Sequence, residues 1–411
     1  MSAEPQMNSA APDPVEEVRP PTTEVGVVGW LHHNLFSSKL NGLLTIVFGA
    51  IVVLVLYGLA QWVIFDARWG VITENMRLFL VGQYPKDQIW RVLLTLTLLS
   101  LATGLSAGSG SSGSVRMLAM MLMAGQLMLA ALVLVSGLGV VSALAVAFGA
   151  LVVLVAMFAA RRFLIRRLWI SLVWLLTAVV GVLLLAGLGA ASPLPSVATN
   201  IWGGLLLTMV LSVAGILLSF PLGVALAIGR RSRLPVVRIV STTYIELIRA
   251  VPLITVLFMA QFLFPLVLPD GLRIDNVIRA IGGITLFSAA YVAENVRGGL
   301  QAIPTGQHEA AFAIGLRTWQ TTVFIVLPQA LRITIPANVG LFISLLKDTT
   351  LAYIIGLLEI LGIGRAVLAN PDYLGTQFEV YLFVAVVFFV LSYTLSQASY
   401  RLEKELGIGE R

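Results

Sequence analysis

The 411-residue sequence contains no cysteine and only three histidines. Disulfide bonds and thiolate metal sites are therefore excluded, and the histidines are too few and too scattered for a histidine metal cluster. No lysine follows a glycine anywhere in the sequence, so the phosphate-binding P-loop is absent. We expect no catalytic residue, metal site or cofactor in this chain, and any ATP that its activity requires must be bound by another subunit.

Charge is also scarce, because only 11% of the residues are charged whereas 58% are hydrophobic. This composition excludes a water-soluble globular protein and predicts an all-α integral membrane protein with several spans. The net charge of +6 does not indicate nucleic-acid binding. The arginines collect at the ends of apolar runs, as they do where they set membrane orientation, and not on one basic face.

Apolar runs of about 20 residues, the length that crosses a membrane, predict about ten transmembrane helices. The spans are expected at residues 41–64, 89–106, two within 117–160 that turn near Gly137 and Gly139, 168–189, 201–228, one from 236 to about 265, 277–302, 333–364 with an interruption at 347–350, and 380–396. Residues 1–40 are predicted to be a disordered cytoplasmic tail, because their first part is rich in proline and acidic residues.

An even number of spans places both termini on one side of the membrane. One side of the membrane collects Lys39 and the arginines within 161–167, 230–238, 317 and 401. The positive-inside rule identifies that side, which also holds both termini, as cytoplasmic. A linker with two prolines at 190–199 separates an N-terminal membrane extension of about five spans, 41–190, from a second group of five spans, 200–407.

The segment 304–328 is the longest markedly polar break in the second half of the sequence. Its polar residues require water or protein around them, so the segment lies outside the hydrocarbon. Pro304 and Thr305 predict the start of a short helix and Gly315 its end, with a left-handed backbone at the glycine. By itself this pattern also fits a capped surface elbow between two spans.

The fixed residues of this segment, and the spacing between them, resemble the EAA loop of ATP-binding-cassette (ABC) importer permeases. The matching residues are Glu309, Ala310, Ala311, Gly315, Leu327 and Pro328. The resemblance implies that the short helix docks on an ATPase subunit and carries ATP-driven motion to the spans. It also implies that the partner ATPase, and not this chain, uses ATP and Mg²⁺.

From about 202 to 407 the sequence resembles the polar-amino-acid subfamily of these permeases, through the stretches 203–208, 249–253, 291–300 and 346–351. The five additional spans resemble the long general and acidic amino acid permeases, which pair with a second, related permease. The resemblance implies an amino acid importer in the bacterial inner membrane. Its partners would be ATPase subunits, a homologous permease and a periplasmic amino-acid-binding protein, and it would work by alternating access.

Two Glu-x-x-Arg pairs occur within the predicted spans, Glu246 with Arg249 and Glu294 with Arg297. The i, i+3 spacing places both charges of a pair on one helix face, and the two pairs lie at about the same depth on consecutive spans. Because an unpaired charge in the membrane is costly, we predict one network of four residues. The alternative is a separate static ion pair on each helix.

Lys347 and Asp348 interrupt another apolar run. Polar residues at such a position indicate a helix break that lines a cavity, although ion pairs that hold spans together are an equal alternative. The candidate pathway or gate residues are Glu246, Arg249, Pro252, Tyr291, Glu294, Arg297, Lys347, Asp348, Thr349 and Thr350.

The main alternative function is a secondary transporter or channel subunit driven by an ion gradient. Such proteins carry ionisable residues at the membrane midplane and often inverted repeats, and no clear repeat relates the two halves of this sequence. A membrane scaffold without a transport role would fit the uncharged stretch 117–160 but not the polar segment 304–328. The sequence does not indicate which amino acid side chain would be accepted.

Overall fold

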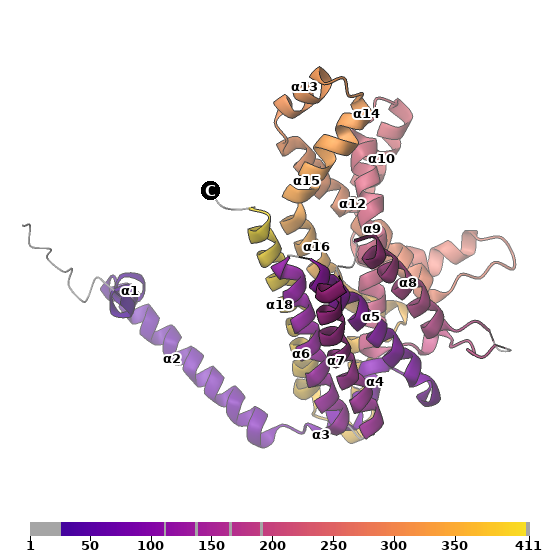
Figure 1. Ribbon diagram of the computed structural model, residues 1–411. Helices are drawn as coiled ribbons and strands as arrows, with labels where there is room; N and C mark the ends of the chain where they lie inside the picture. Colours follow the sequence, from indigo (N-terminus) through magenta and orange to yellow (C-terminus); the bar gives the residue numbers. More distant parts are fainter. Residues whose placement is uncertain (1–25, 111, 136–138, 164–166, 190–191, 408–411) are drawn as a thin grey trace, which may run out of the picture. The chain divides into compact units, whose positions relative to one another are not determined.

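The computed structural model describes residues 26–110, 112–135, 139–163, 167–189 and 192–407. Over these ranges the secondary structure consists of helices, without a β-strand (Figure 1). The chain divides into two compact units, Met1–Ala67 and Arg68–Arg411. The all-α membrane fold predicted from composition is therefore confirmed.

The first unit contains helix α1 (Gly26–Leu35), helix α2 (Lys39–Gln61) and the π-helical turn η1 (Trp62–Asp66). The prediction of disorder over 1–40 is wrong from Gly26 onward, because apolar residues in α1 favour a helix there; residues 1–25 lie outside the described part. The side chain of Ser38 caps α2 by accepting the backbone N–H of Asn41. No residue of α2 is buried, as expected of an apolar helix that faces lipid.

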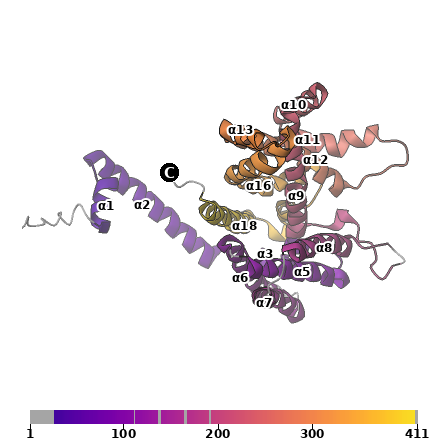
Figure 2. The ribbon, with the colours of Figure 1, turned by 45° about the horizontal axis from the view of Figure 1, so that its top comes forward.

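The second unit begins with the membrane extension. Its elements are α3 (Gly70–Glu74), α4 (Met76–Val81), η2 (Lys86–Gln88), α5 (Ile89–Ser109), α6 (Gly113–Val135), α7 (Val140–Phe163) and α8 (Arg167–Ala186). The prediction of two spans within 117–160 is confirmed by α6 and α7, although the turn residue Gly137 lies outside the described ranges. Helices α6, α7 and α8 pack against α5, and α6 also contacts α18 of the permease core (Figure 2).

The permease core follows the short helix η3 (Thr199–Ile201). Its elements are α9 (Gly204–Arg230), α10 (Pro235–Arg249), α11 (Leu253–Phe258), η4 (Met259–Leu263), η5 (Phe264–Val267), α12 (Asn276–Ala302), α13 (Thr305–Ala313), α14 (Thr318–Gln320), η6 (Thr321–Val326), α15 (Leu327–Ile333), α16 (Ile335–Asp348), η7 (Thr349–Ile355), α17 (Ile360–Leu368), η8 (Pro371–Tyr373) and α18 (Gln377–Glu405).

Within the described residues, nine helices are long and apolar enough to cross a membrane, and a bent pair would make a tenth. That pair corrects the expectation of one continuous span from 236 to about 265. The chain bends by 108° between Arg249 and Leu253. Pro252 explains the bend, because it has no N–H to donate and disfavours helical geometry at Val251. Its ψ of 146° places Pro252 in extended backbone.

Helices α9 and α12 form the most extensive helix contact of the permease core. Glycine makes the close approach possible, since a Cβ atom at Gly223 would lie 2.5 Å from the Cβ of Val292. A Cβ at Gly299 would likewise lie 2.7 Å from the carbonyl oxygen of Ala330 on α15. Small residues therefore hold α12 against both neighbours, as is common in membrane helices. Helix α12 is the element that leads into the polar segment 304–328.

Candidate coupling and pathway sites

The polar segment 304–328 folds as its residues predict. Helix α13 starts directly after Pro304, and Gly315 has φ 84°, the left-handed conformation that glycine adopts without a steric penalty. The N–H of Gly315 donates to Phe312 O at 2.9 Å and the N–H of Leu316 to Ala311 O at 3.1 Å, which closes the end of the helix. Figure 1 shows α13 and α14 at one end of the second unit.

One side of the segment contacts the rest of the chain, and the other side, here called the open side, is exposed. Ala311 is buried, and Gln329 on α15 donates to Gln307 on α13 at 3.2 Å, so this hydrogen bond joins α13 to α15. Glu309, Ala310 and Pro328 are exposed, whereas Leu327 is partly buried. The six residues of the EAA resemblance thus lie in one helix–turn–helix segment, 304–328, which we call the elbow.

Large apolar side chains are exposed in α13 and in the segment that follows it. Ile314 is 75% exposed, and three aromatic residues are also exposed: Phe312, Trp319 and Phe324. Because the segment lies outside the apolar spans, these side chains form an apolar surface in a polar region, which is typical of a docking site for another protein. The sequence signal that was missed is the presence of aromatic residues within a segment expected to be in water.

A cleft of about 890 Å³ lies beside the elbow, between the end of α9 and helices α13 and α14. Its charged lining is basic, with Arg231, Arg233 and Arg317 from the chain segments on either side, and His308 also contributes. Arg231 donates to Leu300 O at 3.2 Å, which joins the end of α9 to α12. The ends of α9 and α12, which adjoin the elbow, are therefore tied to each other.

Four of the candidate pathway residues form one network with a fifth residue, Arg230. Arg230 on α9 lies 2.8 Å from Glu246 on α10 and 3.4 Å from Glu294 on α12. Arg249 reaches Glu294 at 3.5 Å and Glu246 at 4.0 Å. Arg297 completes the network through both carboxylate oxygens of Glu294. The ion pairs therefore cross between three helices and are not confined to each Glu-x-x-Arg pair.

Three arginines face two glutamates in this network, so its formal charge is +1. Glu294 lies at the centre, with 23% of its side chain exposed, whereas Glu246 is 54% exposed. Arg249 also lies over the ring of Tyr291, 5.9 Å from its centroid. Arg249 ends α10, three residues before Pro252, so the network sits directly at the bend of the chain.

The other four candidate residues lie elsewhere in the core, at the junction of α16 and η7. The predicted interruption takes the form of a change from α-helix to 3₁₀-helix after Asp348. The hydroxyls of Thr349 and Thr350 donate to backbone carbonyls within the same turn, at 2.7 and 2.8 Å. No described side chain lies within ion-pair distance of Lys347 or Asp348, so the alternative of an ion pair that holds two spans together is not found there.

Arg230 and Glu359 are polar residues of the core that sequence reasoning did not single out. The Glu359 side chain is fully buried and caps α17 by accepting the N–H groups of Leu361 and Gly362 at 2.9 and 2.7 Å. Burial raises the pKa of its carboxyl to about 7, against the lowering effect of these two hydrogen bonds and of Arg365. The sequence signal for Arg230 was its basic charge, which was interpreted as topological only.

Known proteins similar to this chain are transport permeases. The family described as "Binding-protein-dependent transport system inner membrane component" matches residues 219–404. The chain is 39% identical to the glutamate/glutamine/aspartate/asparagine transport system permease protein BztC of Rhodobacter capsulatus, over 94% of this chain and 95% of that protein.

Two further relatives differ in length. The inner membrane amino-acid ABC transporter permease protein YhdY of Escherichia coli is 35% identical, over 92% of this chain and 93% of its own. The probable glutamine ABC transporter permease protein GlnP of Bacillus subtilis is 36% identical, but the match covers 49% of this chain and 92% of GlnP. These relatives give no support to a secondary transporter or channel. The chain belongs to the binding-protein-dependent inner-membrane transport components and is a permease subunit of the ABC amino-acid transporter family.

Proposed function

We propose that this chain forms part of the translocation pathway of an ATP-driven amino acid importer, with glutamate, glutamine, aspartate and asparagine as the first candidate substrates. The observation that carries the proposal is the elbow 304–328. It combines the EAA residues, a left-handed Gly315 and exposed apolar side chains in a region outside the spans. The substrate candidates follow from BztC, which is similar over nearly the whole chain.

The partners in this proposal supply what the chain lacks. Two ATPase subunits bind ATP and Mg²⁺, since the sequence has no P-loop. A second, related permease completes the pathway, and a periplasmic binding protein delivers the amino acid. The open side of the elbow, with Glu309 and its apolar neighbours Phe312 and Ile314, is the surface that meets the ATPase.

The elbow faces the cytoplasm in the proposed orientation, together with both chain termini. Helix α9 ends in Arg230 next to the elbow, and α7 has Arg161 and Arg162 in its last turn. Basic residues at these ends are those that positive-inside orientation keeps in the cytoplasm. The junctions between α5 and η2 and between α8 and η3 then face the periplasm.

ATP-driven motion enters the spans through α12. Movement of α13 acts on the end of α12 because only two residues separate Ala302 from Thr305. Helix α12 carries Glu294 and Arg297 near this end, and their partners lie on α9 and α10. A shift of α12 therefore breaks or reforms ion pairs across three helices. These helices then have two discrete packings, between which the transporter alternates. The unpaired Lys347 and Asp348 are left to meet the charged groups of the amino acid.

Reconstitution tests this function. The full chain is incorporated into proteoliposomes with the ATPase and the permease encoded beside it, and ATP hydrolysis is measured with and without the binding protein loaded with glutamate. We expect loaded binding protein to raise the hydrolysis rate severalfold. A rate that does not respond to any of the four candidate amino acids would refute the proposal.

A further inference from the structure

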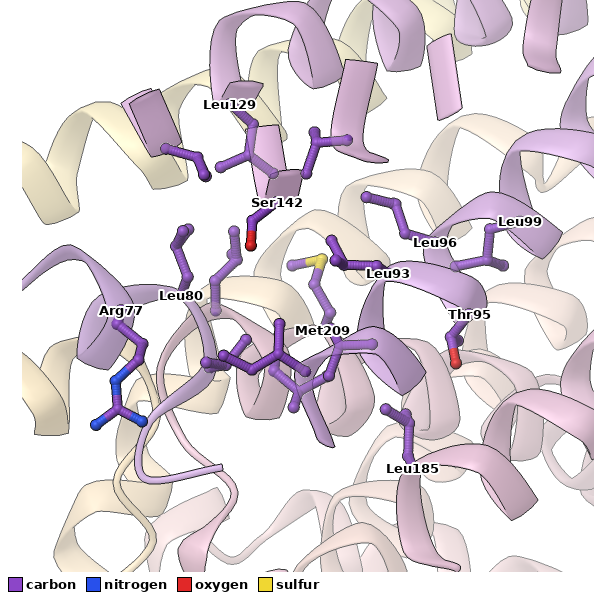
Figure 3. Close-up of a pocket in the computed structure, with 17 residues that line it drawn as sticks. Arg77, Leu80, Leu93, Thr95, Leu96, Leu99, Leu129, Ser142, Leu185 and Met209 are labelled. Atoms are coloured by element: carbon purple, nitrogen blue, oxygen red, sulfur yellow. The ribbon is translucent and has the colours of Figure 1, made fainter. Parts of the chain in front are cut away.

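An apolar cavity of about 220 Å³ lies between the membrane extension and the permease core (Figure 3). Residues from five spans and from α4 line it: α5 contributes most, and Leu129, Ser142, Leu185 and Met209 come from α6, α7, α8 and α9. All of them lie within the described residues of the second unit. The cavity therefore lies at the junction between the two groups of spans. GlnP, whose match covers only 49% of this chain, is too short to contain both groups.

The depth of the cavity in the membrane follows from the positions of its lining residues along the helices. Leu93 lies one turn into α5, Ser142 is in the first turn of α7 and Met209 in the second turn of α9, whereas Leu185 is in the last turn of α8. These four helix ends are opposite to the arginine-rich ends of α7 and α9. In the proposed orientation the cavity occupies the outer leaflet of the bilayer.

Water is a poor occupant of this cavity. Its lining offers few polar groups, and the hydroxyl of Thr95 already donates to the backbone oxygen of Arg91 at 2.8 Å. A water molecule needs two to four polar partners, and an apolar cavity without them stays dry. An amino acid, with two charges, is excluded for the same reason. A hydrocarbon chain from the surrounding bilayer needs no polar partners and carries no charge, so it fits this cavity.

The cationic side chain of Arg77 lies at the edge of the apolar lining. Arg77 on α4 is half-buried, and Figure 3 places it at one end of the cavity, with its guanidinium turned away from the leucines. It donates to Tyr84 O at 3.2 Å, and no described carboxylate pairs with it. A guanidinium at the membrane surface beside an apolar cavity matches the two parts of a phospholipid, a phosphate and an acyl chain.

We propose that this cavity binds one phospholipid of the outer leaflet, with an acyl chain among α5, α7 and α9 and the phosphate on Arg77. Removal from water contributes little to this binding, since the bilayer is as apolar as the cavity. Selectivity rests instead on packing and on the arginine–phosphate contact. The bound lipid fills the junction between extension and core, so the extension acts as a lipid-dependent support of the core. The inference does not depend on the transported substrate.

Photolabelling of the full chain, purified in detergent, tests the site. The probes are a phosphatidylglycerol with a diazirine on its acyl chain and the diacylglycerol with the same diazirine chain. We expect phosphatidylglycerol to label peptides of α5, α7 and α9 in preference to α2, whose surface is exposed all round. Arg77→Gln should lower this labelling at least threefold while leaving diacylglycerol labelling unchanged, and Leu93→Trp should lower labelling by both probes.

Two matched variants serve as controls. Lys86→Gln removes an exposed cation near the same helix ends, and Leu94→Trp enlarges an exposed residue of α5; neither residue lines the cavity. Both should label as the unmodified chain does. Equal labelling of α2 and α5, or labelling that neither Arg77→Gln nor Leu93→Trp changes while both variants remain folded, would overturn the proposal. Size-exclusion profiles and thermal unfolding establish folding independently of lipid.

Discussion

The permease core contains two charged sites among its apolar helices. The charges of the first site are paired with one another, and those of the second site are not. At the bend after α10, three arginines and two glutamates from α9, α10 and α12 neutralise one another almost completely. At the junction of α16 and η7, Lys347 and Asp348 have no ion-pair partner among the described residues. The first site, here called the closed network, holds helices in a defined packing. The second, here called the open site, has charges that are available to a ligand.

The largest effect should follow from removal of the central carboxylate of the closed network. Glu294→Gln leaves Arg230, Arg249 and Arg297 without their shared partner. Loss of one member of a buried ion pair costs about 3 to 5 kcal/mol, and we expect about 3 kcal/mol here because Glu294 is partly exposed. Thermal unfolding in detergent measures the change. A Glu294→Gln chain as stable as the unmodified one would mean that the network does not hold the helices together.

Glu359, a buried carboxyl whose hydrogen-bond partners are also within the chain, should make the free energy of unfolding depend on pH. Its pKa rises from 4.5 to about 7 in the folded chain, so the folded state binds the proton more tightly than the unfolded state. The contribution of Glu359 to the free energy of unfolding is therefore fully present below about pH 4.5. It falls as the pH rises toward 7, by about 2 kcal/mol between pH 5 and 7. Unfolding measured across this range should show the slope, and Glu359→Gln should remove it. An unchanged slope in Glu359→Gln would assign the pH dependence to other groups.

The open site should respond in the opposite direction to the closed network. Asp348→Asn removes a charge that has no ion-pair partner, so we expect unchanged or slightly raised stability together with at least a tenfold loss of uptake, about 1.4 kcal/mol. Uptake of labelled glutamate and thermal unfolding are measured on the same preparation. Ser344→Ala, which alters an exposed residue one turn earlier on α16, serves as the control. Normal uptake by Asp348→Asn would remove this residue from the pathway.

The smallest effect should come from the rim of the closed network. Arg230 and Glu246 lie 2.8 Å apart, but Glu246 is more than half exposed. Pairs of this kind contribute about 0.2 to 1 kcal/mol. A double-mutant cycle with Arg230→Gln and Glu246→Gln, measured on ATPase stimulation as well as on stability, shows whether this contact differs between the two packings. Coupling in stability alone would describe a static pair and not a gate.

Local chemistry explains why the elbow could be predicted in detail. Pro304 and Gly315 delimit α13 through their own backbone preferences, and the span boundaries follow from apolar length. The bend at Pro252 was missed although the proline is visible in the sequence. A proline within an apolar run fits a gentle kink as well as a sharp bend, and the packing of α10 and α11 against α12 decides between them.

Contacts between distant parts of the chain account for the rest. Arg230 is 16 residues from Glu246 and 64 from Glu294, so its place in the network depends on the packing of α9 against α10 and α12. The position of Glu359 depends on the parallel bridge between Gly204 and Glu359, which brings the start of α9 next to α17. Neither contact has a sequence periodicity that would reveal it.

The most direct test concerns the elbow as the link between ATP hydrolysis and transport. Uptake of labelled glutamate is measured in proteoliposomes that contain the complete complex and binding protein, prepared without a sodium gradient and with a protonophore present to abolish the proton gradient. We compare Gly315→Asp, which strains a left-handed backbone, with Gly306→Asp, which has ordinary helical geometry and open space at its Cβ position. The account predicts ATP-dependent uptake that survives the protonophore, is retained in Gly306→Asp and is lost in Gly315→Asp. Uptake that needs no ATP and stops with the protonophore, or full uptake by Gly315→Asp, would contradict it.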